Sequence, residues 1–203
     1  MFYDAIANRH GLPHDPFKSL VAPRPIGWIS TLDSNGVVNL APYSYFNAVS
    51  NDPHIVYFSS VGPKHSQLNA ETSGEFVCSL ATWDLREQMN LTSAEVAAGV
   101  DEMAMAGLEP APSRLVAPPR VAASPVALEC RYLQTLTFPD TAGGPSSNGV
   151  VFGQVVGIHI DDSILSDGMV DMAKLRPIAR LGYMDYTVVD TVFSMTRPKL
   201  ENA

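Results

Sequence analysis

Basic side chains and long apolar runs are scarce in this sequence, and each scarcity excludes a class of protein. The chain has 203 residues, with 13 Lys and Arg against 21 Asp and Glu, so its formal net charge is −8. A nucleic-acid partner is excluded because phosphate neutralisation requires clustered basic side chains. No apolar run approaches the roughly 20 residues of a membrane span, which excludes a membrane partner. The first ten residues, MFYDAIANRH, lack the basic start and apolar core of a signal peptide, which predicts a cytoplasmic protein.

Cysteine is scarce too, and the histidines are poorly spaced for a metal. Cys78 and Cys130 are the only cysteines and lie in strand-like runs. A disulfide or redox pair is one interpretation of them, but reduced, buried core cysteines are favoured. His10 and His14 are four residues apart, yet Gly11 and Pro13 prevent a helix from holding them on one face. We therefore expect surface histidines and no metal site.

Several catalytic signatures are missing. The sequence has no G-x-G-x-x-G after a strand, no Walker loop, no H-E-x-x-H and no G-x-S-x-G. A self-contained Rossmann unit and an α/β-hydrolase are therefore excluded. His159 lies between Ile158 and Ile160, which predicts a strand residue at a rim or an interface, with no evident catalytic partner.

The composition that remains is that of a globular domain built from short elements. Hydrophobic residues make up 46% of the chain and charged residues 17%, while 16 prolines and 14 glycines are spread along it. The spread of turn-forming residues predicts many short elements. We interpret residues 1–203 as a single domain.

The first half of the chain predicts strands joined by tight turns. Asn35-Gly36 is a strong hairpin signal between two apolar runs. The expected strands are Ile26–Leu32, Val37–Ala41, His54–Ser59 and Phe76–Leu80. The expected helices are a short one with Asp15 as N-cap, one over Lys64–Glu71, and one over Trp83–Ala94 opened by Thr82.

The second half predicts two long strands after a surface segment. Residues 99–125 are rich in Pro and Ala and have no period, which favours an ordered surface excursion over a flexible linker. Val126–Phe138 alternates with period two, so one face should point inward. Val150–Ile160 is apolar on both faces and should need another layer or a second subunit to cover it. Short strands are expected over 179–181 and 187–194. The whole pattern predicts a mainly β, antiparallel barrel with a few short helices.

Two polar segments carry the candidate binding residues. SYFNAVSNDP, residues 44–53, is interpreted as a crossing at the edge of the barrel. Its Ser44 and Asn47 offer hydrogen bonds, and Tyr45 and Phe46 offer flat apolar faces, which together suit a planar heteroaromatic ligand.

The second segment is FSSVGPKHS, residues 58–66. It sets two hydroxyls, a lysine and another serine at the start of a helix, a combination that suits a phosphate. The same residues also fit an N-capped helix after a polar turn, with no ligand.

These segments carry a family resemblance. The stretch from Ala22 to Ser60 closely resembles the flavin reductase-like FMN-binding proteins, which include flavoredoxins and small NAD(P)H:flavin oxidoreductases. Further blocks, GVDEMAMAGLEPAPS, PPRVAASPVALEC and RLGYMDYTVVDTVFSMTRP, follow in the family's order. The resemblance implies a Greek-key split β-barrel, a homodimer, and FMN bound at the subunit interface.

The resemblance also implies which side chains hold FMN. Trp28, Ser30 and Thr31 would line the cofactor, and Ser44 to Ala48 would border the isoalloxazine ring with Asn47 at its polar edge. The phosphate would lie on Ser59, Ser60, Lys64 and Ser66, with Arg180 near the ring. The implied cofactor-binding set is Trp28, Ser30, Thr31, Ser44, Tyr45, Phe46, Asn47, Ala48, Ser59, Ser60, Lys64, Ser66 and Arg180.

The sequence departs from the family pattern at two places. Relatives commonly carry Lys-Asp-Thr where this chain has Lys64-His65-Ser66, which keeps the hydroxyl and replaces an acid with His65. Many relatives carry Gly-Gly where it has Gly182-Tyr183, so Tyr183 would narrow the nicotinamide entrance.

The implied activity explains why acid and base groups are few. In flavin chemistry the cofactor carries the reaction, so no catalytic side chain is expected. The leading hypothesis is an FMN-dependent reductase that uses NADH or NADPH and passes electrons to an acceptor or a partner monooxygenase. The alternatives are a non-enzymatic flavin carrier, and a split barrel with another cofactor such as a deazaflavin or haem.

Overall fold

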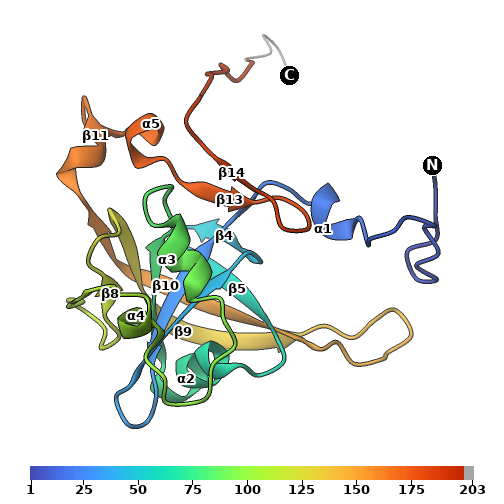
Figure 1. Cartoon of the computed structure of the whole chain (residues 1–203), viewed down its shortest axis with the longest axis horizontal. Coiled ribbons are helices and arrows are strands. Elements are labelled where there is room, and N and C mark those ends of the chain that lie inside the picture. The colour runs from blue at the N-terminus through green and yellow to red at the C-terminus, as the bar shows by residue number, and fades with distance from the viewer. Residues whose placement is uncertain (199–203) are drawn as a thin grey trace.

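The computed structural model describes residues 1–198, and seven of the fourteen strands in this range form one antiparallel sheet (Figure 1). The strand order is β3-β2-β6-β9-β10-β5-β4. Because β3 also contacts β5, the sheet curls into a barrel. The expected mainly β, antiparallel architecture is confirmed. The seven strands are β2 Gly27–Leu32, β3 Val38–Tyr43, β4 Phe46–Asn51, β5 His54–Val61, β6 Glu75–Leu80, β9 Val126–Thr137 and β10 Asn148–Ile160.

Short elements surround the barrel. The helices are α1 Phe17–Leu20, α2 His65–Ser73, α3 Arg86–Leu91, α4 Glu102–Met105 and α5 Met172–Leu175, with a 3-10 turn η1 at Asp162–Ile164. A second sheet joins β1 Arg24–Pro25, β13 Ile178–Arg180 and β14 Tyr186–Val188. Two small ribbons pair β7 Pro110–Ala111 with β8 Arg120–Val121, and β11 Leu165–Ser166 with β12 Met169–Val170. Within residues 1–198 no helix has the length and apolar character that a membrane crossing requires.

The hairpin expected at Asn35-Gly36 is present between β2 and β3. One carboxylate oxygen of Asp33 accepts the backbone N–H groups of Asn35 and Val37, each at 2.8 Å. Gly36 adopts φ +80°, a conformation that glycine enters without steric cost. The turn therefore sets the register of β2 against β3, with Leu32 opposite Val38.

The central strands β2 and β6 are buried on both faces. Consecutive residues of a strand point to opposite faces, and Trp28 and Ile29 accordingly belong to two separate core clusters. Inside the barrel, the rings of Phe58 and Phe76 meet edge to face at 5.4 Å. Outside it, Trp28 packs with Met89 of α3 and other buried side chains. The sheet thus needs a second covering layer beyond the barrel interior.

Residues 99–125 supply part of that layer, as the sequence predicted. Met103, Leu108, Val116 and Val121 are buried there. The N–H of Val121 donates to the Ser79 hydroxyl at 3.1 Å, which ties β8 to β6. The segment is therefore an ordered excursion that packs on the barrel.

The two cysteines are buried and free, which confirms the interpretation of reduced core residues. Cys78 and Cys130 both belong to the cluster inside the barrel. Burial raises the pKa of the Cys78 thiol to about 12.

We expected Val126–Phe138 to bury only one face, and this expectation is wrong for the first half of β9. Ala127 and Glu129 on the other face are buried as well, because the excursion covers them. In the second half, Leu133 and Leu136 are 46% and 36% exposed, and the β9–β10 hairpin projects well beyond the barrel (Figure 1).

Three local expectations are also corrected. The supposed crossing over residues 44–53 contains a true edge strand, β4, because Phe46–Asn51 pairs with β5. The helix predicted over Trp83–Ala94 covers only α3, since Thr82 and the N–H of Trp83 pair with the segment at Arg176–Pro177. The last predicted strand ends at Val188.

The N-cap of the first helix lies one residue later than the predicted Asp15. Pro16 occupies the N-cap of α1, while the Asp15 carboxylate accepts the N–H of Phe17 at 2.9 Å.

Candidate functional site

A cavity of about 370 Å³ opens beside the N-terminus of α2, and we call it the Lys64 cavity. Asn39 and Tyr43 of β3 form one wall, and the segment 92–96 forms another. Lys64, His65 and Ser66 enter from the start of α2, and Glu102 enters from α4. Four segments that are distant in the sequence therefore meet at one hollow on the barrel surface.

Helix α2 presents its N-terminus to this cavity. Lys64 is the N-cap residue, and no side chain caps the helix there. The first N–H groups of a helix have no partner within the helix and carry the positive end of its dipole. The ammonium of Lys64 lies 3.8 Å from the Glu95 carboxylate, but both side chains are largely exposed, so this ion pair contributes little stability. Lys64 is thus available to an anionic ligand.

Hydroxyl and amide groups line the deeper part of the cavity. Asn39 donates to the Ser66 hydroxyl at 3.1 Å, and both residues are buried. Burial raises the pKa of Tyr43, against the smaller lowering effect of hydrogen bonds with Ser66 and Ser60. The wall is a connected network of neutral donors and acceptors.

Glu102 adds a buried carboxyl group to this wall. The residue is 4% exposed, and its Oε2 accepts the N–H of Leu40 at 3.0 Å. Burial raises the pKa of Glu102, and the hydrogen bond from Leu40 offsets this only in part. Because its pKa is raised, Glu102 takes up a proton at a higher pH than an exposed carboxyl group does.

The expected phosphate residues Ser59 and Ser60 lie on β5 and do not line the cavity. The Ser60 hydroxyl donates to the carbonyl of Gly62 at 2.9 Å and is 1% exposed. The Ser59 hydroxyl accepts from Asn148 of β10 at 3.1 Å. Lys64 and Ser66 line the cavity itself, and Ser60 reaches its wall through a hydrogen bond with Tyr43. Ser59, the preceding residue of β5, points to the opposite face of the sheet.

The strand expected to line FMN is enclosed within the chain. Trp28 has no exposed surface, and its indole N–H donates to the Thr92 hydroxyl at 2.9 Å. Ser30 donates to the carbonyl of Pro119, and Thr31 accepts from Asn69 at 3.1 Å. The polar groups of all three side chains thus have hydrogen-bond partners inside the chain.

The residues expected around the isoalloxazine ring lie along the β3–β4 edge. Ser44 and Tyr45 form the turn, and the guanidinium of Arg24 lies 5.8 Å from the Tyr45 ring centroid. The Phe46 ring packs over Gly27, where an added Cβ would come within 2.5 Å of it. Asn47 and Ala48 are exposed, and the Asn47 side chain accepts the N–H of Ala48 at 2.8 Å.

Arg180 lies in a different cavity, of about 550 Å³, with Trp83, Met89 and Tyr186. Its guanidinium stacks on the Tyr186 ring at 4.4 Å and donates to the Tyr186 hydroxyl and the Tyr183 carbonyl. Tyr183 itself adopts φ +54°, a region that L-residues seldom occupy. The structure therefore does not bring Arg180 together with Lys64 in one cavity.

Sequence reasoning missed several residues of the site. Asn39, Tyr43 and Glu102 are brought to the cavity by strand pairing and by the docking of α4. The available signal was weak: a polar Asn39 in an otherwise apolar strand, and an acid after the N-cap Asp101. His159 also has a partner that the sequence did not indicate, since its Nε2 lies 2.5 Å from Glu129 Oε1.

The fold and this cavity define a split-barrel protein with a hydroxyl-lined hollow that contains a lysine at the start of a helix. A family model described as a flavin reductase like domain matches residues 20–180. The chain therefore belongs to the flavin reductase-like family, and the resemblance in its motifs is confirmed.

Individual proteins agree with this assignment. An uncharacterized protein of Aquifex aeolicus is 34% identical over 169 residues, which cover 80% of this chain and 83% of that protein. The crystal structure of nitrilotriacetate monooxygenase component B from Bacillus cereus is 26% identical, with a TM-score of 0.86 over 96% of this chain and 98% of that one. An FMN-binding protein from Thermus thermophilus, solved with p-hydroxybenzaldehyde, is 16% identical and shares the fold with a TM-score of 0.74, over 96% and 99% of the two chains.

Glu102 generates a prediction on pH dependence. Its folded pKa stands above the ordinary value of 4.5, so its contribution to stability is complete below that pH and is lost as pH rises through the folded pKa. Glu102→Gln keeps an oxygen acceptor for the Leu40 N–H and removes the titration. As pH rises from 4.5, the wild type should therefore lose unfolding free energy relative to the variant, by about 1.4 kcal/mol for each unit of pKa elevation.

Denaturant unfolding at several pH values measures this difference. Glu109→Gln, an exposed glutamate on the same excursion, is the matched control and should show no such divergence. Parallel stability curves for the wild type and Glu102→Gln between pH 4.5 and 7 would contradict the assignment.

Proposed function

We propose that this protein is an FMN-dependent NAD(P)H oxidoreductase that binds the FMN phosphate in the Lys64 cavity. Membership of the flavin reductase-like family supports flavin-related oxidoreductase chemistry. The observation that carries the proposal is the meeting of Lys64, the Ser66 hydroxyl and the N-terminus of α2 in one cavity. A cation, a hydroxyl donor and a helix N-terminus together recognise a phosphate.

FMN suits this site better than FAD. The candidate phosphate residues Ser59, Ser60, Lys64 and Ser66 fall within eight positions of the sequence, which has no pyrophosphate fingerprint. The Asn39–Ser66 pair and Tyr43 line the same hollow and can hydrogen-bond a polyol chain. The ring would extend along Ser44 to Ala48, where Asn47 and Ala48 are exposed.

The side chains of the site bind and orient, and they move no proton in the proposed reaction. When bound, FMN supplies the chemistry, accepting a hydride from NADH or NADPH at its N5 atom. The Asn47 amide is the side chain that can meet a pyrimidine edge, because an amide both donates and accepts. Tyr183 would narrow the entrance for the nicotinamide.

A partner enzyme is the proposed recipient of the electrons. The Bacillus cereus neighbour is component B of a monooxygenase, which supports transfer to a partner oxygenase. A small-molecule acceptor is the other destination within the proposal.

Lys64→Ala should weaken FMN binding by about tenfold to a hundredfold, the scale of one charged hydrogen bond of about 1.5–3 kcal/mol. Titration of the apo-protein with FMN, followed by flavin fluorescence, measures the affinity. Lys18→Ala removes the same charge from an exposed site in α1 and should leave FMN affinity unchanged. An unaltered affinity in Lys64→Ala would show that the phosphate lies elsewhere.

The reductase activity has a direct spectroscopic test. The protein should carry or accept FMN, and addition of NADH or NADPH under anaerobic conditions should bleach the flavin absorbance within seconds. A flavin that stays oxidised with both nucleotides would instead identify a flavin carrier without a pyridine nucleotide site. A purified ligand with the mass and colour of a deazaflavin or a haem would reject FMN as the cofactor.

We also propose that the chain forms a homodimer. The projecting end of the β9–β10 hairpin leaves Leu133, Leu136 and Phe138 46%, 36% and 57% exposed, and Val61 beside it is 58% exposed. An apolar surface of this kind marks an interface with another subunit. Light scattering should give twice the mass of 21.9 kDa, and a monomer at micromolar concentration would reject the dimer.

A further inference from the structure

A third cavity, of about 580 Å³, lies between the excursion and the β9–β10 pair, and we call it the Arg120 cavity. Arg114, Arg120 and Pro125 line it from the excursion. Glu129 of β9 and Ile158 and His159 of β10 line it from the sheet. It shares no lining residue with the Lys64 cavity, so the proposed flavin site does not account for it.

Two arginine side chains in this cavity lack partners. Among residues 1–198, neither the Arg114 nor the Arg120 guanidinium makes a hydrogen bond or an ion pair. The Nε of Arg120 is moreover buried without any acceptor. A buried, unsatisfied donor on a charged group is costly and signals a missing acceptor. Unpaired arginines are all the more notable because acidic residues outnumber basic ones, 21 to 13.

Glu129 does not pair with either arginine side chain, because three other donors already occupy most of the acceptor positions of its carboxylate. It accepts from His159 at 2.5 Å and from the N–H groups of Arg114 and Leu115 at 2.7 and 2.6 Å. Burial raises the pKa of Glu129, but the hydrogen bonds from His159, Arg114 and Leu115 outweigh it, so the pKa is lowered and the group stays ionised. Its side chain is only 1% exposed.

Asp161, the other acid of the cavity, lies beyond ion-pair distance of both arginines. Its side chain instead accepts the N–H of Ser163 at 2.8 Å. The two guanidinium groups therefore stay unpaired although two carboxylates, Glu129 and Asp161, also line the cavity.

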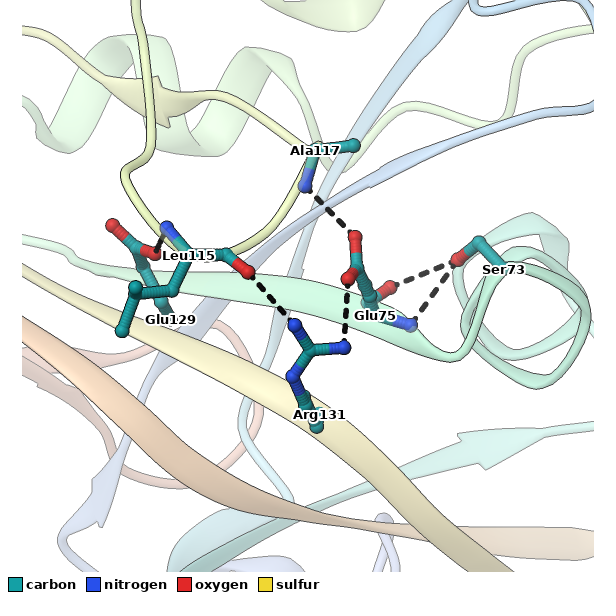
Figure 2. A network of polar contacts seen from close by, with 6 residues as sticks. All are labelled: Ser73, Glu75, Leu115, Ala117, Glu129 and Arg131. Carbon is teal, nitrogen blue, oxygen red and sulfur yellow. Dashed lines mark hydrogen bonds and ion pairs between the residues drawn. The ribbon is translucent and has the colours of Figure 1, made fainter.

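The loop that carries Arg114 is fixed in place by carboxylates and by Arg131 (Figure 2). Besides the two bonds to Glu129, the N–H of Ala117 donates to Glu75 at 2.8 Å. Arg131 joins Glu75 at 3.2 Å to the carbonyl of Leu115 at 3.1 Å. A loop held by four such contacts presents its side chains without a large ordering cost on binding.

We propose that the Arg120 cavity is a binding site for a small organic carboxylate with an apolar body. Arg114 and Arg120 would hold the carboxylate, since guanidinium groups match its two oxygens. Leu115, which lines the cavity from the excursion and is 53% exposed, would contact the apolar body. A bare phosphate would satisfy the arginines and leave Leu115 uncovered, which favours the carboxylate.

Calorimetric titration of the full-length protein tests the site with three probes. Benzoate carries the carboxylate and an apolar body, benzamide is its neutral analogue, and inorganic phosphate is the competing anion. We expect benzoate to bind and benzamide not to bind, with phosphate at least tenfold weaker than benzoate. Absence of benzoate binding, or phosphate binding as tightly as benzoate, would overturn the proposal.

Substitutions of the two arginines test whether benzoate binds in the Arg120 cavity. Arg120→Gln and Arg114→Gln should each weaken benzoate binding at least tenfold, the loss expected for one charged hydrogen bond. Arg114→Gln keeps the backbone bond to Glu129 and alters an exposed side chain, so it tests the site even if Arg120→Gln is unstable. Arg9→Gln removes the same charge from an exposed position in the N-terminal segment and should leave benzoate affinity unchanged.

Two further readouts separate this site from the other proposals. FMN affinity should be unaltered in Arg114→Gln, and benzoate affinity should be unaltered in Lys64→Ala. Loss of benzoate binding in Lys64→Ala would place the probe at the flavin site and overturn the inference. A shift of the monomer–dimer equilibrium in Arg114→Gln without any benzoate binding would overturn it too, because the arginine would then meet a second copy of the chain.

Discussion

The two-sided burial of the central strands is the constraint on which the rest of the structure depends. β2 and β6 have almost no exposed residues, so buried side chains project from both faces of the sheet and both faces must be covered. Curling the sheet covers one face, with Phe58 and Phe76 at the centre of the barrel. The other face needs separate segments, and α3, α4 and β8 provide them.

The Lys64 cavity and the Arg120 cavity both form where this outer layer packs against the barrel. The segment after α3 and the start of α4 close one side of the Lys64 cavity, while the strand β3 and the helix α2 form its other sides. The stretch from Arg114 to Pro125 roofs the Arg120 cavity in the same way. Because apolar contacts hold each covering segment, the polar residues at its ends are left free to line the hollows.

Buried polar groups fix the position of this layer more narrowly than apolar contacts can. The Trp28 indole needs the Thr92 hydroxyl, β8 is tied through Ser79, and Glu129 needs its three donors. Each of these groups would cost about 1–3 kcal/mol if its partner moved away. The requirement of satisfied hydrogen bonds thus selects one docking position for the excursion. The family resemblance places Trp28 and Ser30 near the cofactor. In this chain their hydrogen bonds to Thr92 and to the carbonyl of Pro119 instead help to fix the docking position of the outer layer.

The sequence by itself determined whatever depends on neighbours along the chain. Alternating apolar residues predicted strands over Ile26–Leu32 and Val126–Phe138, which are observed as Gly27–Leu32 and Val126–Thr137, and the Asn35-Gly36 turn predicted the hairpin. The polar run before α2 predicted the start of that helix, and the order of the motifs predicted the family. These features rest on local dihedral preferences and on side-chain period, which a short window contains.

Only the tertiary structure decided which distant side chains meet. Glu102 reaches Leu40 across 62 positions, His159 reaches Glu129 across 30, and Asn39 reaches Ser66 across 27. The pairing of Phe46–Asn51 with β5 made a strand of a segment that reads as a loop. The burial of Ala127 and Glu129 depended on a covering segment that has no period of its own. These pairings are selected by the free energy of contacts between segments that are distant in the sequence. Such contacts leave no pattern within either segment, so the sequence of one segment cannot predict its partner.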